Sequence, residues 1–152
     1  MISGCARPTG SLAAVRALVQ RVSRARVSVG GAPVGEIGPG MCVLLGVGPD
    51  DDEATAEKMA AKLKALRIFE DQDGKMNEPL GDREVLCVSQ FTLYGDTRKG
   101  NRPSFVGAAP PELAEPLWKK VCDLLGAQRG MFGADMEVEL VNDGPVTVMV
   151  EV

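Results

Sequence analysis

MCVLLGV, residues 41–47, is an unbroken apolar run that lies between the turn residues Gly38–Gly40 and an acidic segment that begins at Asp50. The run has the length of a β-strand and lacks the polar and apolar alternation of a strand with one solvated face. We therefore expect a strand that is covered on both faces and lies at the centre of a sheet.

Segments on either side of this run predict further strands. Val15–Val22 begins a β-rich stretch, and Arg26–Val29 alternates before Gly30-Gly31, a pair suited to the positive φ of a tight hairpin. The second strand of this hairpin is expected around Pro33–Ile37. Downstream, Val85–Val88 is a buried strand that leads directly into polar residues.

Two amphipathic segments predict helices. In the first, Asp50 and Glu53 have the spacing of a capping box, and apolar residues recur at three and four positions: Ala56, Met59, Ala60, Leu63 and Leu66. The second opens at Pro110-Pro111-Glu112, and its apolar stripe is Leu113, Leu117, Val121 and Leu124. Because Pro116 has no backbone N–H, we expect it to kink the first turns of this helix or to delay its start.

Two alternating segments close the chain, Met136–Leu140 and Val146–Val150, and the turn composition of Val141–Pro145 predicts a hairpin between them. The order of elements predicts an α/β fold with a mixed sheet, in a single domain over residues 15–152. Residues 1–14 mix Gly, Ser, Pro and Ala and are expected to form a flexible extension. No stretch approaches the ~18–20 apolar residues of a membrane span, so no membrane partner is predicted.

Histidine is absent from the 152 residues. This excludes Ser-His-Asp and Cys-His catalysis and histidine-containing zinc sites. Acids are plentiful, but no cysteine cluster accompanies them, so the sequence predicts no metal site and no cofactor. The four cysteines form no C-x-x-C pair, and Cys42 and Cys87 lie in apolar runs, which favours a reducing, cytoplasmic compartment.

The net charge of −4 argues against broad adhesion to nucleic acid. Positive charge gathers locally, however. Residues 1–35 contain five arginines and no acid, and a second basic group consists of Arg98, Lys99 and Arg102. A local contact with an anion is therefore compatible with the acidic average.

Polar residues follow apolar strands at two places. Ser89-Gln90-Phe91-Thr92 comes directly after the strand at Val85–Val88, and Asn142–Thr147 separates the last two segments. Taken alone, the first is an ordinary strand end and the second a plain turn.

Taken together, Ser89–Tyr94 and Asn142–Thr147 resemble the two signature motifs of the D-aminoacyl-tRNA deacylase family, the hydrolases that proofread chirality in translation. The resemblance extends from about Val15 to Val152 and holds in order and spacing. It includes Gln20-Arg21-Val22, Gly35–Gly40, Leu44–Val47, Asp50–Glu53, Arg67-Ile68-Phe69, Gly74–Asn77, Arg102–Phe105 and Phe132–Met136. It departs from the family at Arg129 and Met131, where relatives often carry Thr and a basic residue. The implied fold is β/β/α, with mixed sheet layers and two main helices packed on one side.

The resemblance also implies a site. Ser89, Gln90, Phe91 and Thr92 would form the reaction centre, with Thr147 at the end of the second motif. In that family the Gly-Pro peptide bond, here Gly144-Pro145, is cis, and the motif inserts into the pocket of the partner subunit of a homodimer. Its backbone carbonyls would hold the substrate's α-amino group, so that hydrogen or a D side chain fits and an L side chain collides. Glycyl-tRNA should then also be accepted.

Two accounts of the chemistry are open, because hydrolysis of the tRNA ester needs an activated water and a stabilised oxyanion. Thr147 could act as a nucleophile, but no histidine is present to deprotonate its hydroxyl. In the account that we favour, the 2′-hydroxyl of the terminal adenosine assists the water, and the protein supplies position and N–H donors near Ser89, Gln90 and Phe91.

Four further residues have two interpretations each. Arg21 is either a solvated surface charge or, by resemblance, a brace for the Gly144-Pro145 loop. Arg102, with its basic neighbours, either contacts phosphates of the tRNA acceptor end or belongs to a solvated loop. Met76 and Phe132 either line the adenosine or aminoacyl pocket or pack in the core.

The competing hypothesis is a nucleic-acid-binding protein on the same scaffold without editing activity. Family members of that kind carry a basic C-terminal tail, whereas this sequence ends at Glu151-Val152. A sibling group that removes misattached L-alanine opens its first motif with Pro-Gln, so Ser89-Gln90 favours the chiral enzyme.

Overall fold

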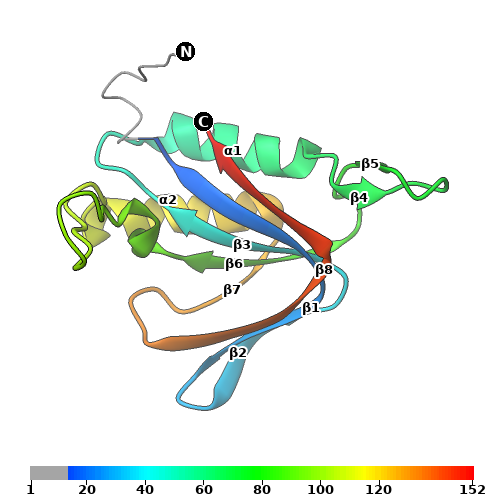
Figure 1. Cartoon of the computed structure of the whole chain (residues 1–152), viewed down its shortest axis with the longest axis horizontal. Coiled ribbons are helices and arrows are strands. Elements are labelled where there is room, and N and C mark those ends of the chain that lie inside the picture. Colours follow the sequence, from blue (N-terminus) through cyan, green and yellow to red (C-terminus); the bar gives the residue numbers. More distant parts are fainter. Residues whose placement is uncertain (1–13) are drawn as a thin grey trace.

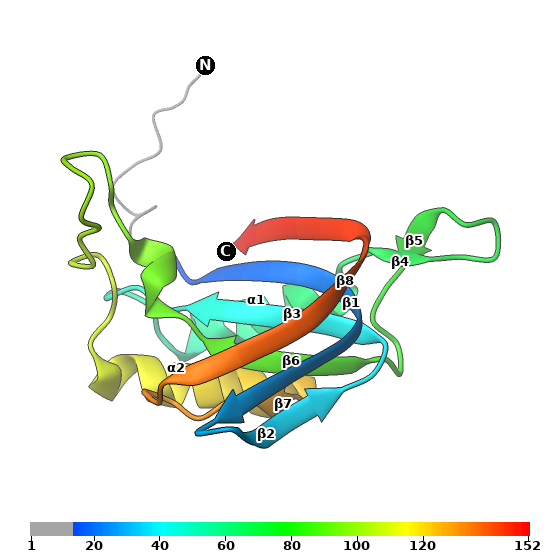
Figure 2. The same ribbon diagram turned by 60° about the horizontal axis from the view of Figure 1, so that its bottom comes forward.

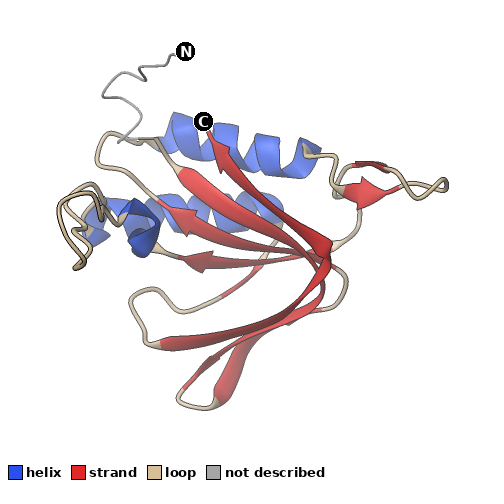
Figure 3. Cartoon of the chain, in the orientation of Figure 1, coloured by secondary structure: helices blue, strands red, loops and turns tan. Residues whose placement is uncertain are grey.

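The computed structural model describes residues 14–152 and forms a mixed α/β domain. The extension expected over residues 1–14 therefore lies, apart from Ala14, outside the described residues. The strands are β1 Arg16–Val29, β2 Ala32–Ile37, β3 Gly40–Gly46, β4 Phe69–Glu70, β5 Met76–Glu78, β6 Glu84–Ser89, β7 Gln128–Arg129 and β8 Met136–Glu151. The helices are α1 Glu53–Ala65, the 3-10 helix η2 Phe91–Tyr94 and α2 Pro111–Leu125 (Figures 1 and 3).

The main sheet is mixed, as the sequence predicted. Its order is β2-β1-β3-β6-β7, with β8 also paired to β1. The strands β2, β3 and β8 run antiparallel to β1, whereas β6 runs parallel to both β3 and β7. The apolar run at residues 41–47 thus forms the middle strand of this order, and its side chains are almost all buried.

β1 and β8 bend so that one end of the sheet curls over the rest (Figures 1 and 2). The first half of β1 pairs with β3 and the second half with β2, while β8 follows β1 along both halves. A small apolar cluster that includes Val27, Leu86 and Val88 fills the space inside this fold. The result is the expected pair of sheet layers.

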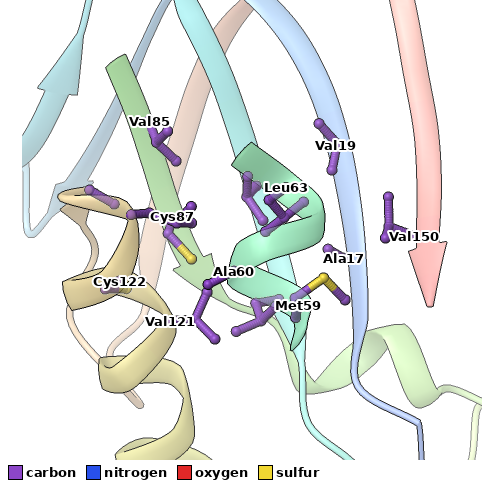
Figure 4. Packing of buried hydrophobic residues seen from close by; sticks show 14 of the residues in the cluster. Ala17, Val19, Met59, Ala60, Leu63, Val85, Cys87, Val121, Cys122 and Val150 are labelled. Carbon is purple, nitrogen blue, oxygen red and sulfur yellow. The ribbon is translucent and has the colours of Figure 1, made fainter. Parts of the chain in front are cut away.

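Both long helices cover the other face of the sheet. Met59 and Leu63 of α1 and Val121 of α2 meet the strand residues Val19 and Val85 in the main apolar core (Figure 4). The β/β/α arrangement with two helices on one side is confirmed. Within residues 14–152, no helix is long and apolar enough to cross a membrane.

The helix starts differ in detail from the prediction. The cap of α1 is Asp52, whose carboxylate accepts the N–H of Thr55, and not Asp50 with Glu53. The neighbouring Asp51 is buried and accepts the N–H of Gly48 at 2.7 Å, and burial raises the pKa of its carboxyl group. The start of α2 is not delayed by Pro116, because the helix already begins at Pro111.

The predicted C-terminal hairpin is wrong. β8 is one strand, and its turn-like residues form a bulge in the ladder with β1. Gln20 pairs with Thr147 and Val22 with Asn142, so the four residues 143–146 lie opposite Arg21 alone. Residues typical of a turn therefore loop out of a continuous strand.

Candidate active site at the end of β6

A cavity of about 550 Å³ opens where β6 ends. Ser89, Gln90 and Phe91 of the first motif contribute to its wall. The other lining residues are small or apolar: Val47, Val88, Phe105, Ala108, Ala109, Pro111, Ala114, Phe132, Gly133, Ala134, Met136 and Val138. None of the lining side chains is ionisable at ordinary pH. The cavity can thus hold an apolar or aromatic group, but it contributes no acid or base of its own.

The first motif leaves the strand and forms a single helical turn. The N–H of Gln90 donates to the carbonyl of Leu45 at 2.8 Å, and η2 begins at the next residue. A 3-10 helix leaves the N–H groups of its first residues, here Phe91 and Thr92, without a partner inside the helix. Phe91 lines the cavity and Thr92 follows it in the chain, so the backbone N–H groups that begin η2 are suited to hold an oxyanion.

Aromatic rings form two sides of the cavity. Phe91 and Phe105 make an edge-to-face contact with their centroids 5.2 Å apart, and Phe91 is still 54% exposed. Phe132 also lines the cavity and packs on the buried Trp118, with 5.8 Å between centroids. Phe132 thus lines the cavity and packs against the core, and its role in an adenosine or aminoacyl pocket stays a prediction.

The second motif lies far from this cavity within one chain. Gly144 and Pro145 are exposed and lie opposite Arg21, which pairs with Met41 near the start of β3. Ser89 lies at the other end of the sheet, where β6 ends beside Leu45. In Figures 1 and 2 the bend of β8 accordingly lies away from the arrowhead of β6. The peptide bond between Gly144 and Pro145 is cis. Met76, on β5, belongs to the same end of the molecule as the bend and lines no part of the cavity. Its role in a substrate pocket stays a prediction.

Arg21 is a buried anchor for the second motif. Only 7% of the residue is exposed; its Nε donates to the carbonyl of Asp143 at 3.1 Å, and its Nη1 donates to that of Ile68 at 2.9 Å. The interpretation as a solvated surface charge is wrong. The guanidinium joins β1, the segment before β4 and the bulge of β8, and so fixes the residue that precedes Gly144.

Thr147 ties the two ends of the same bulge together. Its hydroxyl accepts the side-chain amide of Asn142 at 2.9 Å and that of Gln20 at 3.4 Å. The side-chain oxygen Oδ1 of Asn142 in turn accepts the backbone N–H of Val146 at 3.1 Å. Both neighbours of the hydroxyl are amides, which cannot act as a base at neutral pH.

Two other predicted site residues, Thr92 and Arg102, do not line the cavity. Thr92 is exposed, and its hydroxyl accepts a hydrogen bond from the Gln90 side chain. Arg102 is exposed in the loop 95–107 that leads to Phe105. In this loop Asp96 binds Arg98 through two side-chain bonds, and the guanidinium lowers the pKa of that carboxyl group.

The sequence argument overlooked the wall residues Phe105, Met136 and Val138. Phe105 had a usable signal, since it is the single aromatic residue in an otherwise polar and small loop. Met136 and Val138 had none, because they alternate like the residues of any half-buried strand. Among residues 14–152, no group of three or more His, Cys, Asp or Glu side chains is placed to hold a metal ion.

The sequence model of the D-Tyr-tRNA(Tyr) deacylase family matches residues 18–151. A D-aminoacyl-tRNA deacylase of Desulfatibacillum aliphaticivorans is 59% identical over 90% of this chain and 99% of its own. One from Symbiobacterium thermophilum is 56% identical over 90% of this chain and 95% of its own.

Two solved structures share the fold. A c-Myc DNA unwinding element binding protein has a TM-score of 0.84 and 43% identity, covering 90% of this chain and 98% of its own. A probable eukaryotic D-amino acid tRNA deacylase has a TM-score of 0.79, covering 91% of this chain and 100% of its own; its 16% identity makes it a likeness of fold alone.

The fold, the cavity and these relatives define a hydrolase that cleaves the ester bond of aminoacyl-tRNA. The chain belongs to the D-Tyr-tRNA(Tyr) deacylase family.

Proposed function

We propose that this enzyme hydrolyses D-aminoacyl-tRNA and glycyl-tRNA, and that Gly144-Pro145 excludes L-aminoacyl esters. In this proposal the 2′-hydroxyl of the substrate's terminal adenosine assists the attacking water. The observation that carries the mechanism is the cavity at Ser89-Gln90-Phe91, where the helix η2 begins and where no lining side chain is ionisable. A site of this kind positions a substrate and stabilises charge, so the proton transfer has to come from elsewhere.

The proposed working unit is a homodimer. One chain carries its two motifs at opposite ends, so its own Gly144-Pro145 cannot complete its own cavity without a large rearrangement. The exposed bulge of one subunit would instead enter the cavity of the other. Arg21 supports this arrangement, because it holds the bulge rigidly while leaving Gly144 and Pro145 exposed.

Chiral selection would then rest on backbone atoms. The carbonyl groups of the inserted bulge would accept hydrogen bonds from the substrate's ammonium group and occupy the space on one side of its Cα. A D side chain points away from these carbonyl groups, and the hydrogen of glycine leaves them free, whereas an L side chain collides with them. Because glycine has no side chain, its ester would be accepted as well.

In the proposed reaction the water attacks the ester carbonyl carbon and passes its proton through the 2′-hydroxyl to the departing 3′-oxygen. The N–H groups of Phe91 and Thr92 hold the developing oxyanion. The terminal adenosine would occupy the apolar cavity between Phe91 and Phe132. Arg102 and its basic neighbours would contact acceptor-end phosphates, and the compartment would be the cytoplasm, where charged tRNA is used.

Replacement of Thr147 by Ala tests the competing nucleophile account. We expect kcat for the D-ester to change by less than about 3-fold, because the hydroxyl only orders the bulge, and removal of a partly exposed hydrogen bond costs about 1 kcal/mol. Single-turnover hydrolysis by the folded Thr147→Ala dimer is the measurement. Complete loss of turnover would restore Thr147 as the nucleophile.

The function itself is tested with three esters of the same tRNA. Purified protein is offered D-tyrosyl-, L-tyrosyl- and glycyl-tRNA, and we expect rapid loss of the D and glycyl esters and retention of the L ester. Equal loss of the D and L esters would disprove chiral selection. Binding of the tRNA without loss of any ester would support the hypothesis of a nucleic-acid-binding protein.

A further inference from the structure

Arg16, the first residue of β1, contacts the end of the first motif and is not among the residues that line the cavity. Its Nη1 donates to the carbonyl of Leu93 at 3.2 Å, and its guanidinium carbon lies 4.6 Å from the centre of the Tyr94 ring. Its Nε also lies 3.0 Å from a carboxylate oxygen of Glu151, the residue that ends β8 and faces Arg16 across the ladder. One guanidinium therefore joins η2 to the ends of two strands.

The contact is made at the carbonyl end of η2. In a 3-10 helix the last carbonyl groups have no partner inside the helix, and a cation beside them is favoured both as a donor and by the helix dipole. A single helical turn has few internal bonds, so its direction depends on what holds its two ends. At the other end, the N–H of Gln90 is already bonded to Leu45.

The Tyr94 ring packs against the guanidinium of Arg16 on one side and against β3 on the other. The ring is buried, and its hydroxyl lies within hydrogen-bond reach of the carbonyls of Ala14 and Gly46, to either of which it can donate its single proton. A Cβ atom at Gly46 would lie 2.9 Å from this ring and 3.1 Å from the carbonyl oxygen of Gln90, so the helix rests directly on β3. With the ring fixed below and Arg16 above it, η2 has little freedom to tilt.

We propose that Arg16 is a positioning residue for hydrolysis: by capping the carbonyl end of Phe91–Tyr94 and covering the Tyr94 ring, it holds the N–H groups at the other end of this helix in line with the reacting ester. The proposal rests on the proposed function. Arg16 would act through the N–H groups that hold the oxyanion. Their contribution to kcat depends on alignment with the reacting ester to within a fraction of an ångström. Substrate binding, which involves the rings and the tRNA contacts, should be affected much less.

The test replaces Arg16 with Met, which keeps an unbranched, flexible apolar stem and removes the guanidinium. We expect kcat for D-tyrosyl-tRNA to fall about 10- to 30-fold while KM stays within 2-fold. The matched control is Arg26→Met, because Arg26 also lies on β1 and pairs across the ladder with a glutamate of β8, Glu139, at 2.7 Å, but does not contact η2. For this control we expect both constants to stay within 2-fold.

The outcomes separate a positioning role from a purely structural one. An unchanged kcat for Arg16→Met, equal losses in both variants, or a rise in KM alone would each overturn the proposal. If Arg16→Met does not fold, Arg16→Lys is used. The ammonium group of Lys can bind the Leu93 carbonyl but cannot cover the Tyr94 ring as a guanidinium does, so we expect a 3- to 10-fold loss of kcat. A loss of kcat below 2-fold in this variant overturns the proposal. Inactivity of the unmodified protein would instead refute the proposed function, and the positioning role with it.

Discussion

A D-aminoacyl-tRNA that ends in 2′-deoxyadenosine is expected to be hydrolysed about 100-fold or more slowly than the ribose substrate, with little change in binding. The reason is the composition of the cavity, whose wall contains no ionisable side chain. A positioned proton acceptor and donor contributes about 10²–10⁴ to such a reaction, and the 2′-hydroxyl is the group on the substrate that can fill this role. The measurement is single-turnover release of the amino acid at saturating enzyme.

The control for this experiment is the uncatalysed reaction. A neighbouring hydroxyl also affects hydrolysis of the free ester, so each enzymatic rate is divided by the rate of the same ester without protein. The expected loss concerns this ratio. A ratio that changes by less than about 3-fold would mean that a side chain of the protein moves the proton, and the Thr147 variant would then show whether that side chain is Thr147.

Much of the fold could be predicted because the residue pattern of its central strands is compatible with only one kind of secondary structure. The apolar run at residues 41–47 has no polar position, so only a strand with both faces covered suits it. Gly30 and Gly31 both have positive φ, as the predicted hairpin requires. In these segments local preference and burial favour the same structure.

The bulge of β8 could not be predicted, because its local signal is that of a turn. Asn142–Pro145 would reverse the chain if nothing else acted on it. Here β1 is long enough to pair with both halves of β8, and the backbone bonds of that ladder keep the strand continuous. Long-range pairing thus overrides turn composition, and a single sequence carries no sign of it.

The site was predictable only in part, and for a related reason. Ser89–Phe91 follows a buried strand, so its place at the end of the sheet follows from the sequence. The wall formed by Phe105 and Val138 depends on how a loop and a distant strand approach the motif. The role of Arg16 is equally hidden, since one arginine at the start of a strand resembles any other until its contact with Leu93 is known.

Replacement of Gly144 by Ala is expected to lower kcat/KM for the D-ester about 30- to 100-fold and to reduce the discrimination between D and L esters. Gly144 has a φ of +124°, which L residues rarely adopt. An added Cβ would also lie 2.9 Å from Nη2 of Arg21. That guanidinium is fixed by the carbonyls of Ile68 and Asp143 and cannot retreat, so the bulge itself must move. A displacement of about 1 Å near reacting groups can cost about 100-fold.

The matched variant is Gly126→Ala at the end of α2, where φ is +61° and an added Cβ meets nothing within 4 Å. It also places an L residue at positive φ, at a cost of about 1 kcal/mol of stability, but in the αL region and outside both motifs. Loss of stability alone would therefore act on both variants, whereas a lower ratio of D to L hydrolysis should appear only in Gly144→Ala. If Gly144→Ala folds and keeps the ratio of the unmodified enzyme, the bulge is not the element that excludes L-amino acids, and selection has to come from the cavity wall.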